Sequence, residues 1–309
     1  MTQAPTPTAD TVRQLVRSLL KNGDSKRGAG PEVQPVAEGG THSTWWVGSR
    51  HVLRLAQDRD TAVRRRRELR LRDLVRPHLG VAVPVSVAQG DWSGGLAYTL
   101  DTRLSGGTAE EHEVSAVGEA DLAALLTGLR EVPLRQAETL GVPRLAPRSL
   151  EALRTAAGRA ARHLGEADEF VPARLGQLSA ATAGQLVASP PVLVHHGLTG
   201  EHLVVSADGR VRGVLGWTDT AIGDPAEDIA GLAAAVGSPA AVRAATLAGY
   251  GARPCLRGLW LARCDTVVHL SEGLQGRGDA PLPVLRDRLR RSWEPILLER
   301  VTDIRDEDA

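Results

Sequence analysis

The stretch from Val192 to Leu232 constrains the fold of this chain more than any other part of its sequence. It contains three short runs rich in β-branched residues, VLVH, HLVV and VRGVLGW, which predict strands. The last two runs are separated by Ala207-Asp208-Gly209, residue types that favour a tight turn. A helix is then predicted from Gly223-Asp224-Pro225, because Asp suits a helix cap and Pro suits the first turn. The stretch therefore predicts a strand, a loop, a hairpin and a helix, in that order.

Apolar periodicity predicts the elements on both sides of this stretch. Helices are expected over Thr8–Lys21 and Arg59–Arg76, with strands in 33–56 and 81–106. Further helices are expected at Glu119–Arg130, Leu150–Leu164, Pro172–Ala188, Ala226–Val236, Ala240–Tyr250, Gly258–Gly273 and Pro283–Arg300. A strand-rich first part followed by a mostly helical remainder indicates an α+β protein.

Charge and composition exclude several classes of function. The 309 residues carry 37 Lys and Arg and 37 Asp and Glu, so no net charge attracts the chain to nucleic acid or to a membrane surface. The N-terminal residues lack the basic segment and the apolar run of a signal peptide, and no apolar run is long enough to span a membrane. The cysteines, Cys255 and Cys264, lack zinc spacing and are expected to be reduced core thiols. We therefore expect a soluble, cytoplasmic protein without nucleic-acid or membrane partners.

The sequence of Val192–Leu232 resembles the catalytic core of the aminoglycoside and macrolide phosphotransferases, which are kinase-fold enzymes. The core of that family contains the motif HGDLxxxN, then a hairpin, and then the motifs DW and GDPxxDLA. The segments GTHSTWWVGSRHVLRL and DWSGGLAYTLDTRL extend the resemblance over nearly the whole chain. The resemblance implies a two-lobed, protein-kinase-like α+β fold. It implies a small β-rich N-lobe at 1–103, a helical C-lobe at 104–302 that contains the core at 192–232, and an acidic tail at 303–309.

The core departs from the family at the positions that carry the chemistry. Laid on the family's pattern, His195 matches its His, His196 its Gly, and Gly197 the aspartate that receives the substrate's hydroxyl proton. His202 stands at the metal-binding Asn, and Gly216 at the magnesium-chelating Asp. Kinase-fold enzymes hold the metal with Asp and Asn and orient the nucleophile with another Asp. Because glycine does neither, we expect no phosphoryl transfer and weak or absent binding of nucleotide and magnesium.

The resemblance also implies residues for a ligand-binding cleft. Arg54 stands where kinase-fold proteins carry the lysine that pairs with the nucleotide phosphates, and Glu68 matches the glutamate partner of that lysine. We expect an ion pair between Arg54 and Glu68, which suits a nucleotide site and a structural remnant equally well. Tyr98, Asp101 and Arg103 lie in the segment that matches the hinge against which adenine stacks.

The run Arg64–Arg67, within the helix expected over Arg59–Arg76, has two interpretations. It is either a binding patch or a solvated helix face, and charge runs on helices are usually solvated. We therefore predict a solvent-exposed face.

Side chains on the loop itself are candidates for replacement chemistry. His196 and His202 are either acid–base groups, since histidine titrates near neutral pH, or residues that fill vacated polar space. Zinc is not expected, because the histidines of HHGLTGEH lack the spacing of zinc ligands. Glu201 in this segment is expected to be a further residue of the ligand-binding cleft. His195 is expected to be structural and to donate to the backbone.

Three aspartates follow the loop. Asp224 and Asp228 match GDPxxDLA, and we expect them to hold the loop and the helix start through backbone amides. Asp219 lies three residues beyond Gly216 and is a candidate to replace the chelating aspartate in part, although one carboxylate makes a poor magnesium site.

The leading functional hypothesis rests on similarity to the phosphotransferase-like proteins of lanthipeptide and thioamitide biosynthesis. It makes the chain a natural-product enzyme, without metal or other cofactor, that works beside partner biosynthetic proteins. The enzyme would bind a dehydrated peptide and close a thioether ring, with His196, His202 and Asp219 as catalytic residues. The alternatives are a non-catalytic pseudokinase scaffold and an atypical ATP-dependent phosphotransferase of a small-molecule ligand, such as an aminoglycoside or a macrolide.

Overall fold

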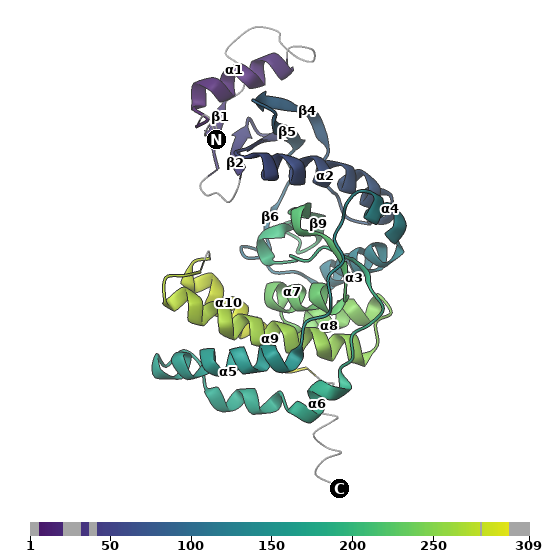
Figure 1. The fold of residues 1–309 in the computed structure, drawn as a ribbon, viewed down its shortest axis with the longest axis vertical. Coiled ribbons are helices and arrows are strands. Elements are labelled where there is room, and N and C mark those ends of the chain that lie inside the picture. Colours follow the sequence, from purple (N-terminus) through teal and green to yellow (C-terminus); the bar gives the residue numbers. More distant parts are fainter. Residues whose placement is uncertain (1–5, 21–31, 37–41, 279, 297–309) are drawn as a thin grey trace. The chain divides into compact units, whose positions relative to one another are not determined.

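The fold is taken from a computed structural model, which describes residues 6–20, 32–36, 42–278 and 280–296. The chain divides into two compact units (Figure 1). The first unit consists of the described residues up to Pro77 together with Ala82–Ser105, and the second of His78–Val81 and the described residues from Gly106 onward. The acidic tail expected at 303–309 lies outside the described residues.

The first unit is built on one antiparallel sheet with the strand order β1-β2-β3-β5-β4, so that β4 is an edge strand. Its elements are α1 (Ala9–Leu20), β1 (Val33–Pro35), β2 (His42–Val47), β3 (His51–Ala56), α2 (Arg59–Val75), β4 (Ser86–Ser93) and β5 (Leu96–Thr102). The sheet buries Trp45, Leu53 and Leu100 in one core, and α1 adds Val12 and Val16 to it. Burial of these apolar side chains is the main stabilising contribution to such a unit.

Helix α2 shows that the prediction of a solvated face over Arg64–Arg67 is wrong in part. Arg64 and Arg66 are exposed, but Arg65 is fully buried, with its Nη1 3.1 Å from Glu68 Oε2. Successive residues of a helix are about 100° apart, so four consecutive arginines cannot all face water on one side. Arg65 and Arg72 instead belong to the buried stripe that also contains Glu68.

The second unit contains two small antiparallel sheets and most of the helices. Its strands are β6 (Gly107–Thr108), β7 (Val192–Val194), β8 (Leu203–Val205), β9 (Val211–Val214) and β10 (Ala221–Gly223). Its helices are α3 (Ala116–Glu131), α4 (Leu134–Thr139), α5 (Leu150–Glu166), α6 (Ala180–Gln185), α7 (Ala226–Val236), α8 (Ser238–Leu247), α9 (Ala252–Leu274) and α10 (Leu282–Ser292). The order strand, loop, hairpin and helix predicted for 192–232 is present, and β10 is an additional strand that pairs with β7.

One predicted helix is absent in the expected form. The segment Pro172–Ala188 contains a 3₁₀ turn at Pro172–Gln177 and then α6. The chain leaves helical geometry at Leu178, and Ser179 starts a new helix because its Oγ accepts a hydrogen bond from Thr182 N at 3.1 Å.

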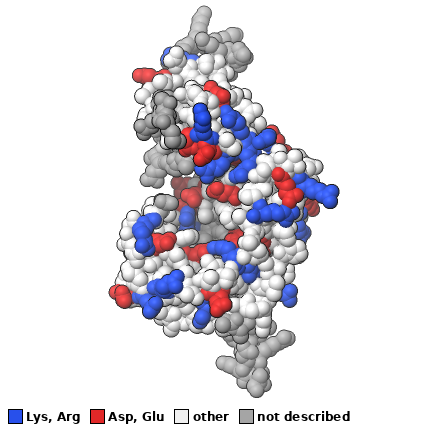
Figure 2. All heavy atoms as spheres, viewed as in Figure 1, with Lys and Arg blue, Asp and Glu red and all other residues white. Residues whose placement is uncertain are grey.

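Helices α7 and α9 pack closely, because a Cβ atom placed on Gly258 would lie 2.6 Å from Ile229 Cγ2. None of the helices among the described residues is both long and apolar enough to cross a membrane. On the face drawn in Figure 2, basic and acidic side chains are interspersed.

Candidate functional site

The loop between β7 and β8 is anchored by an aspartate of α7. Asp228 accepts hydrogen bonds from the backbone N–H of His195 at 2.8 Å and of His196 at 2.9 Å. The ring of His195 is buried, with Nε2 2.8 Å from the carbonyl oxygen of Leu215 and its centroid 4.7 Å from that of Trp217. These contacts connect the loop to α7 and to the segment that follows β9.

The imidazole of His202 lies between Gly197 and Gly216, the two glycines that the resemblance aligns with carboxylates. Its Nδ1 is 2.6 Å from the carbonyl oxygen of Gly197 and 3.2 Å from Thr199 Oγ1. On the opposite side, a Cβ atom on Gly216 would lie 2.4 Å from Nε2 of the same ring. Gly216 also has a φ of +79°, a conformation that glycine adopts without steric cost. An aspartate at Gly216 would therefore need both a strained backbone and a displaced His202.

Gly197 is under no such constraint. A Cβ atom there would lie 3.8 Å from His202 Nδ1, which is ordinary van der Waals contact. A side chain at Gly216 therefore requires His202 to move, whereas packing leaves room for one at Gly197.

The protonation of His202 follows from its partner. The carbonyl oxygen of Gly197 only accepts hydrogen bonds, so Nδ1 carries the proton and, in the neutral ring, Nε2 keeps its lone pair. His202 is half-buried, which leaves part of the ring open to solvent. This arrangement suits a base that takes up a proton at Nε2.

His196 presents an exposed ring from a backbone that favours glycine. Its φ is +61°, in the left-handed region that residues other than glycine rarely adopt. Asp228 accepts a hydrogen bond from its backbone N–H, and the side chain lies in solvent.

The residues present do not fit a magnesium ion at this loop. Magnesium takes oxygen ligands, whereas Gly197 and Gly216 offer no side chain and His202 Nδ1 is bonded to a carbonyl oxygen. Asp219 is exposed on the 3₁₀ turn Trp217–Asp219. Across the described parts of the chain, no three His, Cys, Asp or Glu side chains gather closely enough to hold a metal ion.

The two buried aspartates that follow have structural partners. Asp224 accepts from the backbone N–H of Ala226 at 3.1 Å and pairs with the guanidinium of Arg257, which also donates to the carbonyl oxygens of Leu186 and Arg148. Burial raises the pKa of Asp228 to about 7, against the lowering effect of its two backbone hydrogen bonds. Both side chains hold the loop and the start of α7 in place.

The expected ion pair between Arg54 and Glu68 is present in the first unit. Arg54 Nη1 on β3 lies 3.5 Å from Glu68 Oε1 on α2. Glu68 is buried and shares its other oxygen with Arg65 at 3.1 Å. Desolvation lowers the pKa of Arg65 to about 10.

The three residues expected at the hinge segment lie in different surroundings. Tyr98 packs in the core of the first unit beside Gly90, and burial raises its pKa. Asp101 is buried, and its oxygens accept hydrogen bonds from Arg72 and Thr99. Arg103 is exposed, with its guanidinium carbon 4.2 Å from the centroid of the Trp46 ring.

Glu201 completes the predicted set. It is exposed, accepts from Thr199 Oγ1 at 3.0 Å, and lies 3.7 Å from Arg288, which also pairs with Glu110.

Sequence reasoning missed the buried arginines of α2. Thr61, Arg65, Glu68, Arg72 and Val75 follow one another at spacings of four and three residues, which is the pattern of a single buried helix face. That spacing was the available signal, but arginine is rarely buried, so residue type argued against it.

Comparisons with known proteins show the family and the fold. The sequence model of the phosphotransferase enzyme family matches residues 32–259. The structure is similar to the GDP complex of wild-type aminoglycoside 2'-phosphotransferase-IIIa, with 18% identity, a TM-score of 0.67, and coverage of 93% of this chain and 98% of that chain. It is also similar to the apoenzyme of macrolide 2'-phosphotransferase MphH from Brachybacterium faecium, with 22% identity, a TM-score of 0.60, and coverage of 92% and 99%. No curated protein sequence matches the chain. The predicted kinase-like α+β fold is thereby confirmed.

Proposed function

The chain belongs to the phosphotransferase enzyme family, and we propose that it has kept the fold while losing ATP-dependent phosphoryl transfer. One observation carries this proposal: the ring of His202 fills the space into which a carboxylate at Gly216 would project, with Nε2 2.4 Å from the Cβ position. Phosphoryl transfer needs groups that neutralise phosphate charge through a metal and orient the nucleophile. We propose that nucleotide and magnesium binding are weak or absent and that no other cofactor is used.

The same geometry supports proton transfer. His202 Nδ1 donates to the carbonyl oxygen of Gly197, so in the neutral ring Nε2 keeps the lone pair that a general base uses. We propose that the substrate is a dehydrated natural-product peptide. In the proposed reaction Nε2 takes the proton of a cysteine thiol, and the sulfur forms a bond to the β-carbon of a dehydroamino acid. The α-carbon then receives a proton from the imidazolium, which closes a thioether ring and restores the base.

We propose that His196 contacts a bound peptide or delivers a proton, because its side chain is exposed on the same loop. Asp219 is exposed after Gly216 and is proposed as a further polar contact. Partner biosynthetic proteins would supply the dehydrated peptide.

Loss of kinase chemistry is tested by incubating the purified protein with ATP or GTP, magnesium, and kanamycin or a macrolide. We expect no release of nucleoside diphosphate above background, and calorimetry should show nucleotide binding that magnesium does not strengthen. Magnesium-dependent turnover by the wild type that disappears in Arg54→Ala would overturn the proposal, whereas equal turnover by both proteins indicates a contaminant.

Ring closure is tested with a dehydrated peptide that contains one cysteine. The product has the mass of the substrate, so the reaction is followed as the loss of a thiol that N-ethylmaleimide labels. His202→Ala should slow the reaction about 10²-fold, as expected for a lost acid–base group, while the control His269→Ala, an exposed histidine of α9, should not. Equal rates for wild type and His202→Ala would show that this histidine is a bystander. Absence of product with the wild type would favour a non-catalytic scaffold.

A further inference from the structure

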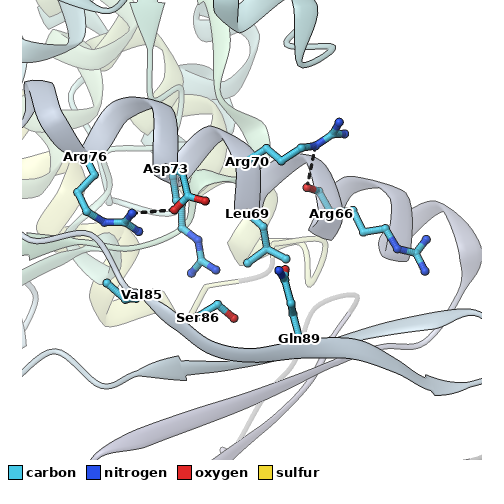
Figure 3. A pocket seen from close by; sticks show the side chains of 9 residues that line it. Arg66, Leu69, Arg70, Asp73, Arg76, Val85, Ser86 and Gln89 are labelled. Atoms are coloured by element: carbon cyan, nitrogen blue, oxygen red, sulfur yellow. Dashed lines mark hydrogen bonds and ion pairs between the residues drawn. The ribbon is translucent and has the colours of Figure 1, made fainter.

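A cavity of about 490 Å³ lies in the first unit between α2 and the edge strand β4. Figure 3 shows Arg66, Leu69, Arg70 and Asp73 on α2 and Arg76 in the turn that follows it, with Leu69 pointing toward Gln89 on the strand side. Val85 and Ser86 also lie on the strand side. Arg72 also lines the cavity. All residues that line this cavity belong to the first unit, whereas His202 belongs to the second.

The arginines of this cavity differ in how far their charge is neutralised. Arg66 pairs with Asp91 at 2.6 Å, and Arg76 pairs with Asp73 at 2.7 Å. The guanidinium of Arg70 forms no ion pair with any described residue, and its Nε lies 3.4 Å from the carbonyl oxygen of Arg66. The cavity wall therefore carries more positive than negative charge.

Arg72 is a buried arginine behind the cavity whose hydrogen-bonding groups are only partly used. Its side chain is 2% exposed, and Nη2 donates to Asp101 at 3.0 Å. Its Nε and Nη1 have no hydrogen-bond partner among the described residues, and the same holds for Nε of Arg76. Buried donors on a charged group are costly to leave without an acceptor. Three N–H-bearing nitrogens of two cavity-lining arginines thus lack an acceptor among the described residues, and all three are shielded from solvent, so they add uncompensated positive charge behind the cavity wall.

We propose that this cavity binds the phosphate group of a small phosphate ester. Guanidinium groups bind tetrahedral oxyanions through paired, charge-assisted hydrogen bonds, and Arg70 and Arg76 line the cavity with such groups. The buried Arg72 adds positive charge behind the wall. The volume exceeds that of an inorganic anion and falls within the range of small-molecule sites. Leu69 and Val85 add apolar surface for the organic part of the ester.

The test is calorimetric titration of the full-length protein with inorganic phosphate and with phenyl phosphate, at constant ionic strength set with chloride. We expect saturable binding at one site, tighter for phenyl phosphate, because its ring adds apolar contact. Arg70→Ala should weaken binding about tenfold or more, as expected for the loss of a charged hydrogen bond. Arg70 is exposed, so this variant is expected to fold, and its melting temperature checks that it does.

Arg64→Ala is the matched control, because Arg64 is an exposed arginine of the same helix that does not line the cavity. Its affinity for both probes should equal that of the wild type. Equal weakening in Arg64→Ala and Arg70→Ala would show attraction to the general charge of α2 and would overturn the proposal, as would the absence of saturable binding. Equal affinity for the two probes would reject the ester and leave a site for the inorganic anion alone.

Discussion

Gly216→Ala should destabilise the protein by about 2–3 kcal/mol. A residue other than glycine in left-handed geometry costs about 1–2 kcal/mol, and Gly216 has a φ of +79°. The new methyl group would lie 2.4 Å from His202 Nε2, so the ring has to move. Movement of the ring breaks its 2.6 Å hydrogen bond to Gly197, which adds about 1 kcal/mol.

The steric part of this cost is separated from the backbone part by a double-mutant cycle with His202→Ala. When the ring is absent, Gly216→Ala should lose only the backbone cost, so we expect a coupling free energy of about 1 kcal/mol between the two sites. The free energy of unfolding is measured in urea for the wild type, both single variants and the double variant. Unfolding is followed by tryptophan fluorescence, to which the buried Trp217 contributes.

Gly141→Ala is the control for the backbone cost alone. Gly141 has a φ of +81°, and a Cβ atom placed there meets nothing within 4 Å. Its destabilisation should match that of Gly216→Ala in the His202→Ala background. Two results would contradict this reasoning: additive effects of the Gly216 and His202 substitutions on the free energy of unfolding, or no greater destabilisation by Gly216→Ala than by Gly141→Ala. Either would show that His202 does not fill the space beside Gly216.

Three further predictions concern the parts that hold the loop in place. Arg257→Ala should lower the free energy of unfolding by about 3–5 kcal/mol, because it leaves Asp224 buried without its cation. Urea unfolding measures this, and the control Arg253→Ala, at an exposed position of α9, should leave the free energy of unfolding nearly unchanged. The pKa of Asp228 is about 7 in the folded chain and 3.8 as an ordinary value, so its proton stabilises the fold fully below about pH 4, and this contribution is lost as pH rises through 7. The stability difference between wild type and Asp228→Asn should therefore be more favourable to wild type at pH 5 than at pH 8, and a difference independent of pH would contradict it. Gly258→Ala should destabilise the protein by about 1–3 kcal/mol through the contact with Ile229. Gly158→Ala, in an open position of α5, should stabilise it by about 0.5–1 kcal/mol. Melting temperatures in the opposite order would refute the close packing of α7 on α9.

The sequence by itself determined the family, the order of elements in 192–232 and the absence of carboxylates at Gly197 and Gly216. These are properties of residues close together in the chain, where turn chemistry, caps and apolar spacing act locally. The cap at Ser149 shows this directly, because its Oγ accepts from Ala152 N at 3.2 Å at the predicted start of α5. The break at Leu178 was not predicted, since Pro172–Ala188 contains residues that are all compatible with one helix.

Only the tertiary structure decided what surrounds Gly197 and Gly216. His202 meets Gly197 and Gly216 because the loop after β7, the start of β8 and the end of β9 converge, and no local pattern encodes that meeting. The pairing of Arg72 with Asp101 likewise depends on α2 lying against β5, twenty-nine residues away in sequence. Local sequence sets backbone preferences over a few residues, whereas the space around a side chain is set by segments that only folding brings together.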